Sequence, residues 1–199
     1  MYYPMMINLA FFKCLIIGGG HIAYQKAKML LAYGATVTVL SPEFCEEIKC
    51  LEGQMNLLKA SYSEDYLLAF QLVIAATNDR ACNATIGKAC KKQGKLCDVV
   101  TDQALSSFLV PAGIRRGDLI ISVSTQGKSP ALAAKIKKEL ESLYDESYSD
   151  YVACLGEWRA TIKKEIKDEE ERRRLLKYLI TLDQETLKSI SLKELSRVL

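Results

Sequence analysis

The sequence predicts an α/β protein whose first half forms a parallel sheet, and three observations support this fold class. Short apolar runs alternate with segments of helical periodicity between residues 13 and 100. A glycine turn at residues 18–20 joins the first apolar run to the first helical segment. Beyond residue 100 the alternation stops, and charged helical segments follow. Strands that alternate with helices favour a parallel sheet, because parallel strands need a crossover connection.

The composition bounds the protein's class. Hydrophobic residues make up 49% of the 199 residues and charged residues 26%, which is typical of a soluble globular protein. The net charge of +3 is too small to indicate nucleic-acid binding. No apolar run is long enough to cross a membrane, and residues 1–8 lack the features of a secretion signal. We expect a cytoplasmic protein with neither a nucleic acid nor a membrane as partner.

Cysteine and histidine usage bears on redox state and metal binding. The seven cysteines are an odd number without CxxC spacing, which favours reduced thiols in a cytosolic protein. His21 is the only histidine, and it lies in the glycine turn, so a His-rich metal site is excluded. We therefore predict no metal site.

The glycine turn carries the first functional motif. Cys14–Ile17 is predicted to be a buried strand, Gly18–Gly20 the turn, and the helix begins at His21 and ends near Gly34. The pattern Gly18-x-Gly20-x-x-Ala23 is the dinucleotide-binding fingerprint, with Ala in place of the third Gly. Backbone N–H groups of the first helical turn would face a pyrophosphate. The candidate cofactor-binding residues here are Gly18, Gly20, His21 and Ile22. The alternative is a glycine turn that binds nothing.

The second strand ends without the usual acidic residue. It is predicted over Ala35–Leu40, and Ser41 and Pro42 follow it as candidate cofactor-binding residues. A dinucleotide site usually has Asp or Glu near this point to hold the ribose hydroxyls. The ribose contact would therefore come from Ser41, from backbone, or from Glu43. No arginine lies nearby to favour a 2′-phosphate, so the sequence favours NAD over NADP.

Three further strands are predicted over residues 55–60, 72–76 and 96–100, with short helices over 43–52 and 62–70 and a longer one over 79–93. The fourth strand ends in Thr77-Asn78-Asp79, polar residues at the carboxyl edge of the sheet. Because ligands bind at this edge in doubly wound sheets, Thr77 and Asn78 are candidate cofactor-binding residues. Their alternative role is helix capping, and both roles can hold at once.

The second half changes pattern. Strands are predicted over 107–112 and 118–124, with 113–117 as the loop of a hairpin or the approach to one. Ser129 and Pro130 read as an N-cap and first helical residue, followed by an amphipathic helix to Tyr144. From Tyr148 onward the chain is predicted to be helical and charged. The arginine run 172–174 is a solvated helix face or a basic edge for a polyanionic substrate.

Four stretches of the chain resemble the precorrin-2 dehydrogenase family of sirohaem synthesis, which includes the dehydrogenase/ferrochelatase module of sirohaem synthases. They are GGGHIAYQK (18–26), AATND (75–79), SFLVPA (107–112) and SVSTQGKSPALA (122–133). The last stretch is far more specific than the glycine loop. The resemblance covers nearly the whole chain in order.

The resemblance implies an organisation and an activity. It implies a Rossmann-type NAD-binding domain over 1–112, a small α+β dimerisation segment (strand plus helix) over 113–145, and a C-terminal helical domain over 146–199. It implies a homodimer that oxidises precorrin-2 with NAD⁺, and some members also insert Fe²⁺. The substrate carries eight carboxylates, so Ser124, Lys128 and Arg115 are its candidate binding residues, with Arg116 and the arginine run as further basic groups.

One departure concerns the proposed acid–base group. The family often reads Asn-Val-Val-Asp after the fifth strand, where this chain has Asp98-Val-Val-Thr101, followed by Asp102. Thr101 occupies the family's Asp position, and Asp102 would substitute if the loop shifts by one residue. Asp98 lies too far upstream to do so. The catalytic candidates are Asp102 and Thr101, and the alternative for Asp102 is a cap on the following turn.

Two functions from different classes remain. The first is an NAD-dependent precorrin-2 dehydrogenase, with iron insertion left open and put in more doubt by Thr101. The second is a nucleotide-sensing Rossmann module that regulates a partner. The specific segment 107–135 argues against the second, and the absence of a ribose carboxylate argues against it mildly.

Overall fold

The computed structural model describes residues 2–195 and divides the chain into two compact units, Met1–Val110 and Pro111–Leu199. The predicted second and third segments, 113–145 and 146–199, fall in one compact unit. The division into three segments therefore stays a prediction.

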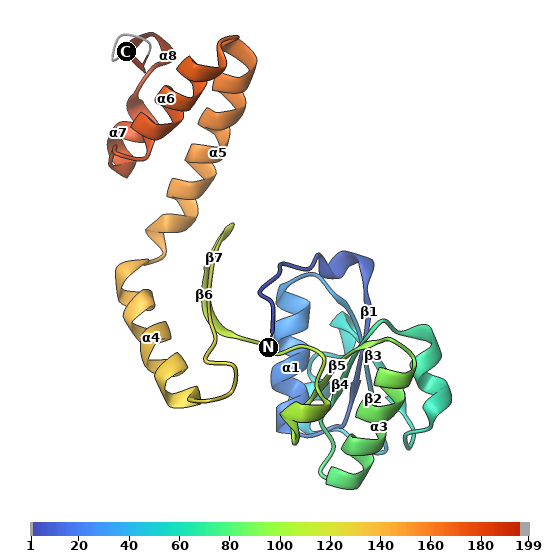
Figure 1. The fold of residues 1–199 in the computed structure, drawn as a ribbon. Coiled ribbons are helices and arrows are strands. Elements are labelled where there is room, and N and C mark those ends of the chain that lie inside the picture. Colours follow the sequence, from blue (N-terminus) through green and yellow to red (C-terminus); the bar gives the residue numbers. More distant parts are fainter. Residues whose placement is uncertain (1, 196–199) are drawn as a thin grey trace. The chain divides into compact units, whose positions relative to one another are not determined.

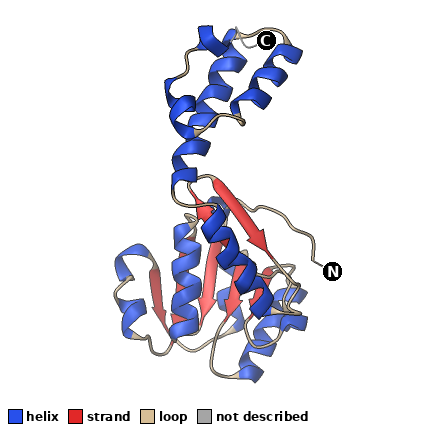
Figure 2. Ribbon diagram, turned by 90° about the vertical axis from the view of Figure 1, so that its left-hand side faces the viewer, coloured by secondary structure: helices blue, strands red, loops and turns tan. Residues whose placement is uncertain are grey.

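The first unit is a five-stranded parallel sheet of order β3-β2-β1-β4-β5, which confirms the predicted fold class (Figures 1 and 2). Its strands are β1 (Lys13–Ile17), β2 (Thr36–Ser41), β3 (Asn56–Lys59), β4 (Leu72–Ala75) and β5 (Leu96–Val99). Its helices are α1 (His21–Ala32), α2 (Glu46–Lys49) and α3 (Arg80–Lys92). Short 3₁₀ turns lie at Leu9–Phe11, Glu52–Gln54, Glu64–Ala69 and Gln103–Leu105.

The sheet is buried on both faces because its strands are apolar at successive positions. In β1, Cys14 and Ile16 pack on one side with residues of α1 and α2, and Leu15 and Ile17 pack on the other with residues of α3. Buried Ala23 and Ala27 let α1 approach the first face closely, as the fingerprint predicts for Ala23. Two apolar layers therefore hold the sheet, and its carboxyl edge stays available for a ligand.

The strand order places a topological switch point between β1 and β4. The chain leaves β1 toward β2 on one side and returns on the other side at β4. In sheets of this kind the loops after the two switch-point strands separate and form a crevice for the ligand. Here those loops begin at Gly18 and at Ala76.

The predicted strand at 107–112 is wrong: residues 107–110 form no strand, and β6 is Ala112–Arg116, where the loop was expected. Two serine hydroxyls at the start of this segment, those of Ser106 and Ser107, cover the open edge of β5 instead. Ser107 Oγ accepts from Cys97 N at 2.8 Å and Ser106 Oγ accepts from Val99 N at 2.9 Å. Since side chains make most of these bonds, no strand ladder forms, although the edge is protected.

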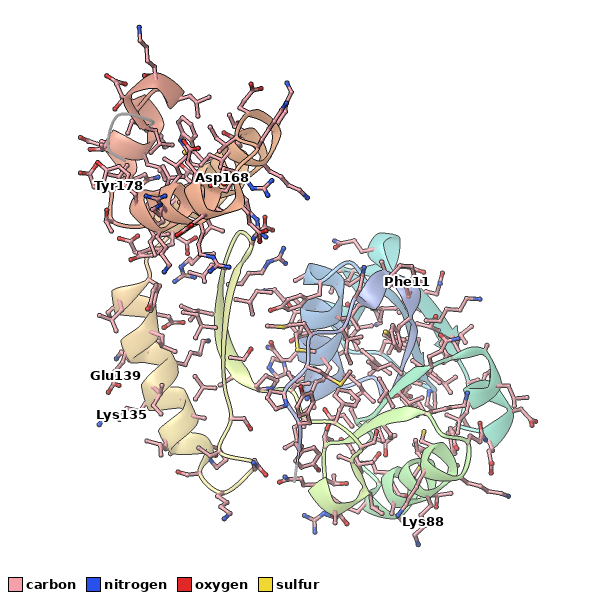
Figure 3. The ribbon with its side chains drawn as sticks, turned by 45° about the horizontal axis from the view of Figure 1, so that its top comes forward. Phe11, Lys88, Lys135, Glu139, Asp168 and Tyr178 are labelled. Carbon is pink, nitrogen blue, oxygen red and sulfur yellow. The ribbon has the colours of Figure 1, made fainter. Side chains whose placement is uncertain are left out.

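The second unit begins with a hairpin of β6 and β7 (Leu119–Val123), beside which α4 (Pro130–Leu143) lies (Figure 1). The two-residue turn Gly117-Asp118 has a positive φ of 56° at its glycine, which a tight hairpin turn requires. Ser129 caps α4 by accepting from Leu132 N, with Pro130 in its first turn, as predicted. Lys135 and Glu139 lie one turn apart on the exposed side of α4, Nζ to Oε1 3.8 Å (Figure 3).

The unit ends in α5 (Ser147–Glu165), α6 (Glu169–Leu179), α7 (Gln184–Ser189) and α8 (Leu192–Leu195), which confirms the predicted helical character. Their core is aliphatic and comprises Ile162, Leu175, Leu179, Leu187 and Leu195. Trp158 Nε1 donates to Leu187 O at 3.0 Å and ties α5 to α7. Among the described residues, no helix is both long enough and apolar enough to span a membrane.

Candidate functional site

The glycine loop after β1 passes directly over the backbone of its neighbours. Gly18 has a φ of 130°, and a Cβ there would overlap the carbonyl oxygen of Ala76. A Cβ at Gly19 would overlap the carbonyl oxygen of Glu43, and Gly19 O accepts from Cys45 N at 2.8 Å. These two glycines therefore lock the loop against the strand ends on both sides, because no larger residue fits.

Gly20 has the opposite surroundings. A Cβ there would meet nothing within 4 Å, and its φ of −94° suits any residue. Gly20 is also the N-cap of α1, and no side chain caps that end. The free N–H groups of the first turn and the open space above Gly20 fit a dinucleotide pyrophosphate. The chain's own residues are thus suited to hold the cofactor that the fingerprint predicts.

A pocket of about 650 Å³ opens at this point, within the range typical of ligand sites. Six predicted cofactor residues line it, namely Gly18, Gly20, Ser41, Pro42, Thr77 and Asn78. His21 and Ile22 do not line it. Several residues that the sequence does not predict as cofactor contacts also line it, among them Ser61 and Tyr62 after β3 and Cys82 on α3. The structure therefore brings together the ends of β1, β2 and β4, as the fold class predicts.

The end of β2 offers both polar candidates for a ribose contact. Ser41 is buried, and its hydroxyl lies close to the Cα of Gly19. Glu43 is exposed and also lines the pocket. The choice between Ser41, Glu43 and backbone as the ribose partner stays a prediction.

His21 lies on the first turn of α1 with its side chain 68% exposed. Its Nδ1 is 3.7 Å from Glu47 Oε1 on α2, and its Nε2 is 3.2 Å from Gln25 Nε2. The neighbouring Glu47 has a lowered pKa, chiefly because of hydrogen bonds to backbone and to Cys45, with the charge of His21 as a smaller cause. The imidazole therefore sits between α1 and α2, near the Gly20 end of the pocket.

Tyr62 contributes a buried hydroxyl to the same neighbourhood. The hydroxyl has no hydrogen-bond partner among the described residues. Burial, with smaller effects from Cys90 and Glu64, raises the pKa of Tyr62 to about 12. This phenol therefore stays protonated at neutral pH.

Thr77 is held by a residue that the sequence analysis missed, the fully buried Asn83 of α3. Asn83 Oδ1 accepts from Thr77 N at 3.0 Å and from Thr77 Oγ1 at 2.8 Å. Its Nδ2 donates to Thr77 O at 3.0 Å and to Thr101 Oγ1 at 3.4 Å. The alternative role of Thr77 and Asn78 as the helix cap is wrong. The N-cap of α3 is Asp79, whose Oδ1 accepts from Ala81 N and Cys82 N.

The catalytic candidates follow β5, outside the residues that line the pocket. Asp102 is exposed, and its Oδ1 accepts from Ala104 N at 2.9 Å, so the capping alternative is confirmed. The Thr101 hydroxyl faces the Asn83 amide. Asp98 is buried and binds Lys26 Nζ at 2.7 Å. Roles of Asp102 and Thr101 in proton transfer stay predictions.

The substrate candidates belong to the second unit. Arg115, Ser124 and Lys128 are exposed. Ser124 Oγ accepts from Gln126 N at 3.1 Å in the turn that leads to α4, and Arg115 Nε donates to Gly117 O. Arg116 is largely buried and has a structural role, because it donates to Tyr144 O and pairs with Glu146. A role of the other three in substrate binding stays a prediction.

Metal-ligating side chains do not gather in the described part of the chain. No group of three or more His, Cys, Asp or Glu residues there could hold a metal ion. All seven cysteines are free thiols.

Known proteins share these features. A family model described as putative NAD(P)-binding matches residues 5–112, and one described as the central part of sirohaem biosynthesis proteins matches residues 116–143. The siroheme synthase of Photorhabdus laumondii is 34% identical over 174 residues, which are 86% of this chain and 37% of that protein. Siroheme synthase 1 of Yersinia pestis is 35% identical over 185 residues, which are 92% and 39% of the two chains. The chain thus spans less than half the length of these relatives.

A solved structure matches over almost the full length. SirC, a precorrin-2 dehydrogenase, has a TM-score of 0.78 and 32% sequence identity, and the match covers 98% of this chain and 96% of that one. Both the dinucleotide-binding unit and the segment that follows it are therefore shared with proteins of one pathway. The chain belongs to the precorrin-2 dehydrogenase family of sirohaem biosynthesis proteins.

Proposed function

We propose that this protein oxidises precorrin-2 to sirohydrochlorin with NAD⁺ as the hydride acceptor. The observation that carries the proposal is the dinucleotide-type pocket at the switch point, in a chain that matches SirC over 98% of its length. The oxidation removes a hydride and a proton from the tetrapyrrole. Bound NAD⁺ supplies the hydride acceptor, and the chain supplies position and a route for the proton.

The residues of the first unit bind and orient the cofactor in this proposal. Gly20 and the first-turn N–H groups of α1 hold the pyrophosphate, and Ser41 or Glu43 holds a ribose. Thr77 and Asn78, at the end of β4, border the nicotinamide end. The Cys82 thiol and the Tyr62 hydroxyl, which also line the pocket, stay protonated, because partial burial raises the pKa of both groups. The pocket wall therefore adds no negative charge there.

The substrate's carboxylates need positively charged partners, and the proton that leaves the substrate needs a base. Arg115 and Lys128 carry positive charge, and the Ser124 hydroxyl adds a hydrogen-bond donor for such carboxylates. Asp102 carries an exposed carboxylate that accepts the proton, with Thr101 beside it. Iron insertion by this chain stays a prediction, and Fe²⁺ would then be a second substrate.

The decisive experiment is an anaerobic assay of precorrin-2 with NAD⁺, followed by addition of Fe²⁺ or Co²⁺. Wild type and Asp102→Ala are compared, with Asp118→Ala, an exposed turn residue, as the control. NADH formation by wild type, reduced in Asp102→Ala alone, is the expected result. Metal insertion that is also lost in Asp102→Ala would assign both steps to this carboxylate. Binding of NAD⁺ without any NADH formation would favour the nucleotide-sensing module instead.

We propose further that the protein is a homodimer, through the hairpin and α4. Within residues 112–143, Ile114 and Ala133 alone are buried, so this part has little core of its own. A two-stranded hairpin is marginal in isolation, and no further described strand pairs with either of its edges. Leu132 and Leu143 of α4 are 48% and 68% exposed and add apolar surface.

Light scattering during size exclusion tests the dimer. We expect a mass of twice 22.2 kDa for wild type and a shift toward the monomer for Leu132→Glu. Lys135→Gln, on the charged side of the same helix, should leave the mass unchanged. A wild-type mass of 22.2 kDa at micromolar concentration would refute the proposal.

A cytoplasmic location is also proposed. The seven free thiols support it, because such thiols persist in a reducing compartment. Fractionation of cells that express a tagged chain would test it, and recovery with the membrane or secreted fraction would contradict it.

A further inference from the structure

The end of β4 is where the sheet's own hydrogen bonding stops. Ala76 N still donates to Ile17 O at 2.8 Å, and Val100 N donates to Ala75 O at 3.1 Å, so the ladder reaches these residues. Thr77 is the next residue along, and it lines the pocket. Its backbone N–H and C=O have no strand beside them and need partners from elsewhere.

The Asn83 side chain supplies both partners. Its amide accepts from Thr77 N and donates to Thr77 O, each at 3.0 Å, which is the pairing that a neighbouring strand would give. A flipped amide would set Oδ1 against the Thr77 carbonyl oxygen, so the backbone fixes the orientation. With Thr77 Oγ1 and Thr101 Oγ1 as the other partners, both oxygen lone pairs and both N–H groups are used.

The Asn83 amide is fully buried, so each of its hydrogen bonds must be made within the protein. Asn83 is 0% exposed, so water cannot replace a lost partner at its amide. Buried polar networks of this kind stabilise one geometry when every member is satisfied, and cost free energy when one is not. Asn83 also joins two strand ends, because it contacts Thr77 after β4 and Thr101 after β5.

We propose that Asn83 is a positioning residue that holds the Thr77–Asn78 segment in the shape needed to bind NAD⁺, through its paired hydrogen bonds to Thr77. The proposal deepens the proposed function and rests on the cofactor half of it. Asn83 does not line the pocket, so it acts through Thr77 rather than by contact with the cofactor.

Asn83→Asp is the informative variant, because its hydrogen-bonding pattern depends on pH. The protonated acid has one acceptor oxygen and one O–H donor, as the amide pair requires, whereas the carboxylate has no donor and faces the Thr77 carbonyl oxygen. The dissociation constant of NAD⁺, measured by calorimetry on the full chain between pH 5 and pH 8.5, should be about tenfold or more weaker than wild type at the alkaline end. The ratio of variant to wild type should fall toward one at the acid end.

Two further variants complete the design. Asn83→Ala removes every hydrogen bond of the side-chain amide and should weaken NAD⁺ binding by about tenfold at all pH values. Thr85→Ala, an exposed residue of the same helix whose hydroxyl contacts only Ala81 O among the described residues, should match wild type. Taking the ratio at each pH cancels the contribution of the charged groups that the variants share, namely Glu43 and Asp79 at the pocket and His21 and Glu47 beside it.

The outcomes separate the two proposals. If wild type binds NAD⁺ and both folded Asn83 variants bind equally well, the positioning role is wrong while the proposed function stands. A binding loss in Asn83→Asp that does not vary with pH would overturn the paired-amide geometry. Failure of both variants to fold at any pH would assign Asn83 to stability alone and overturn the proposal. Absence of NAD⁺ binding by wild type would overturn the proposed function itself.

Discussion

Substitution of Gly20 should affect cofactor binding without affecting the stability of the fold. Because an added Cβ meets no protein atom and φ is −94°, Gly20→Ala should leave the melting temperature unchanged. The same Cβ would occupy space that the pyrophosphate needs, so NAD⁺ should bind about tenfold more weakly, which is about 1.4 kcal/mol. Calorimetric titration and a thermal melt measure the two quantities. Gly53→Ala, also in open space but away from the pocket, is the control.

The ion pair of Lys26 with Asp98 is the most buried ion pair among the described residues of the first unit. The Asp98 side chain is only 9% exposed and that of Lys26 is 24% exposed, with 2.7 Å between Nζ and Oδ2. Lys26→Met leaves a buried carboxylate unpaired and should lower the free energy of unfolding by about 3 kcal/mol. Urea unfolding followed by circular dichroism measures this change.

Two comparisons give that prediction its controls. Adding Asp98→Asn to Lys26→Met should recover most of the loss, because the unpaired charge is removed. Lys135→Met breaks an exposed pair and should cost less than about 1 kcal/mol. Equal losses for Lys26→Met and Lys135→Met would contradict the importance of burial.

At the residue scale, the sequence predicts site residues that belong to a local backbone motif. It misses residues whose role depends on a contact with a distant part of the chain. Gly18, Gly20 and Thr77 follow from the fingerprint and from the carboxyl edge of a strand, and all three line the pocket. Asn83 gives no such signal, since a polar residue in a helical segment reads as exposed. Its one indication is its place on the face shared with Ile86 and Cys90, which is buried. Tyr62 was likewise unpredictable, because its position depends on the crossover after β3.

Aspartate caps stabilise the helices of the second unit and make that unit sensitive to acid. Asp183 Oδ1 accepts from Thr186 N at 2.8 Å at the start of α7, and this hydrogen bond lowers the pKa of Asp183. A lowered pKa in the folded state contributes stability above the unfolded value of 3.8, and the contribution is lost as the pH falls below it. Glu194, which closes a capping box with Ser191, has a lowered pKa for a similar reason.

The melting temperature of Asp183→Asn should therefore fall less between pH 7 and pH 3 than the melting temperature of wild type. Asparagine remains a good N-cap acceptor and does not titrate. Trp158 reports the transition, because it is the only tryptophan and its Nε1 donates to α7. An identical pH response in both proteins would mean that the Asp183 cap is not coupled to unfolding of these helices.

At the scale of elements, periodicity predicts what is buried rather than which backbone groups pair. The apolar run at 108–110 has the composition of a strand, yet Ser106 and Ser107 use hydroxyls to satisfy β5 and leave no ladder for the run to join. Gly113 was expected in a loop, although a Cβ there would press on Ile121 O of the partner strand. Only the pairing register, in which Gly113 faces Ser122, reveals its role.

The whole first unit should be able to bind the cofactor alone. Every residue that lines the pocket, and every residue of the two cores that flank the sheet, precedes residue 111. A chain of residues 1–110 should fold and bind NAD⁺ within about threefold of the full-length dissociation constant, a difference below 1 kcal/mol. Calorimetry on both chains makes the comparison. A much weaker affinity in the short chain would show that the second unit contributes to the cofactor site.

For the whole molecule, the sequence predicts the fold class because alternating strands and helices allow few arrangements. The order β3-β2-β1-β4-β5 then follows from right-handed crossovers around one switch point. Substrate residues lack an equivalent rule. Charge and the family resemblance predict Arg115 and Lys128, and charge alone does not distinguish them from Arg116, whose guanidinium binds Tyr144 O and Glu146.

The solitary imidazole has a practical consequence for spectroscopy. Because His21 is the only histidine and lies between α1 and α2 beside the Gly20 end of the pocket, every imidazole resonance in a proton NMR spectrum originates there. The protein thus carries its own unlabelled reporter of events at that end of the pocket, and each addition of a dinucleotide can be followed in a single pair of ring signals without any assignment.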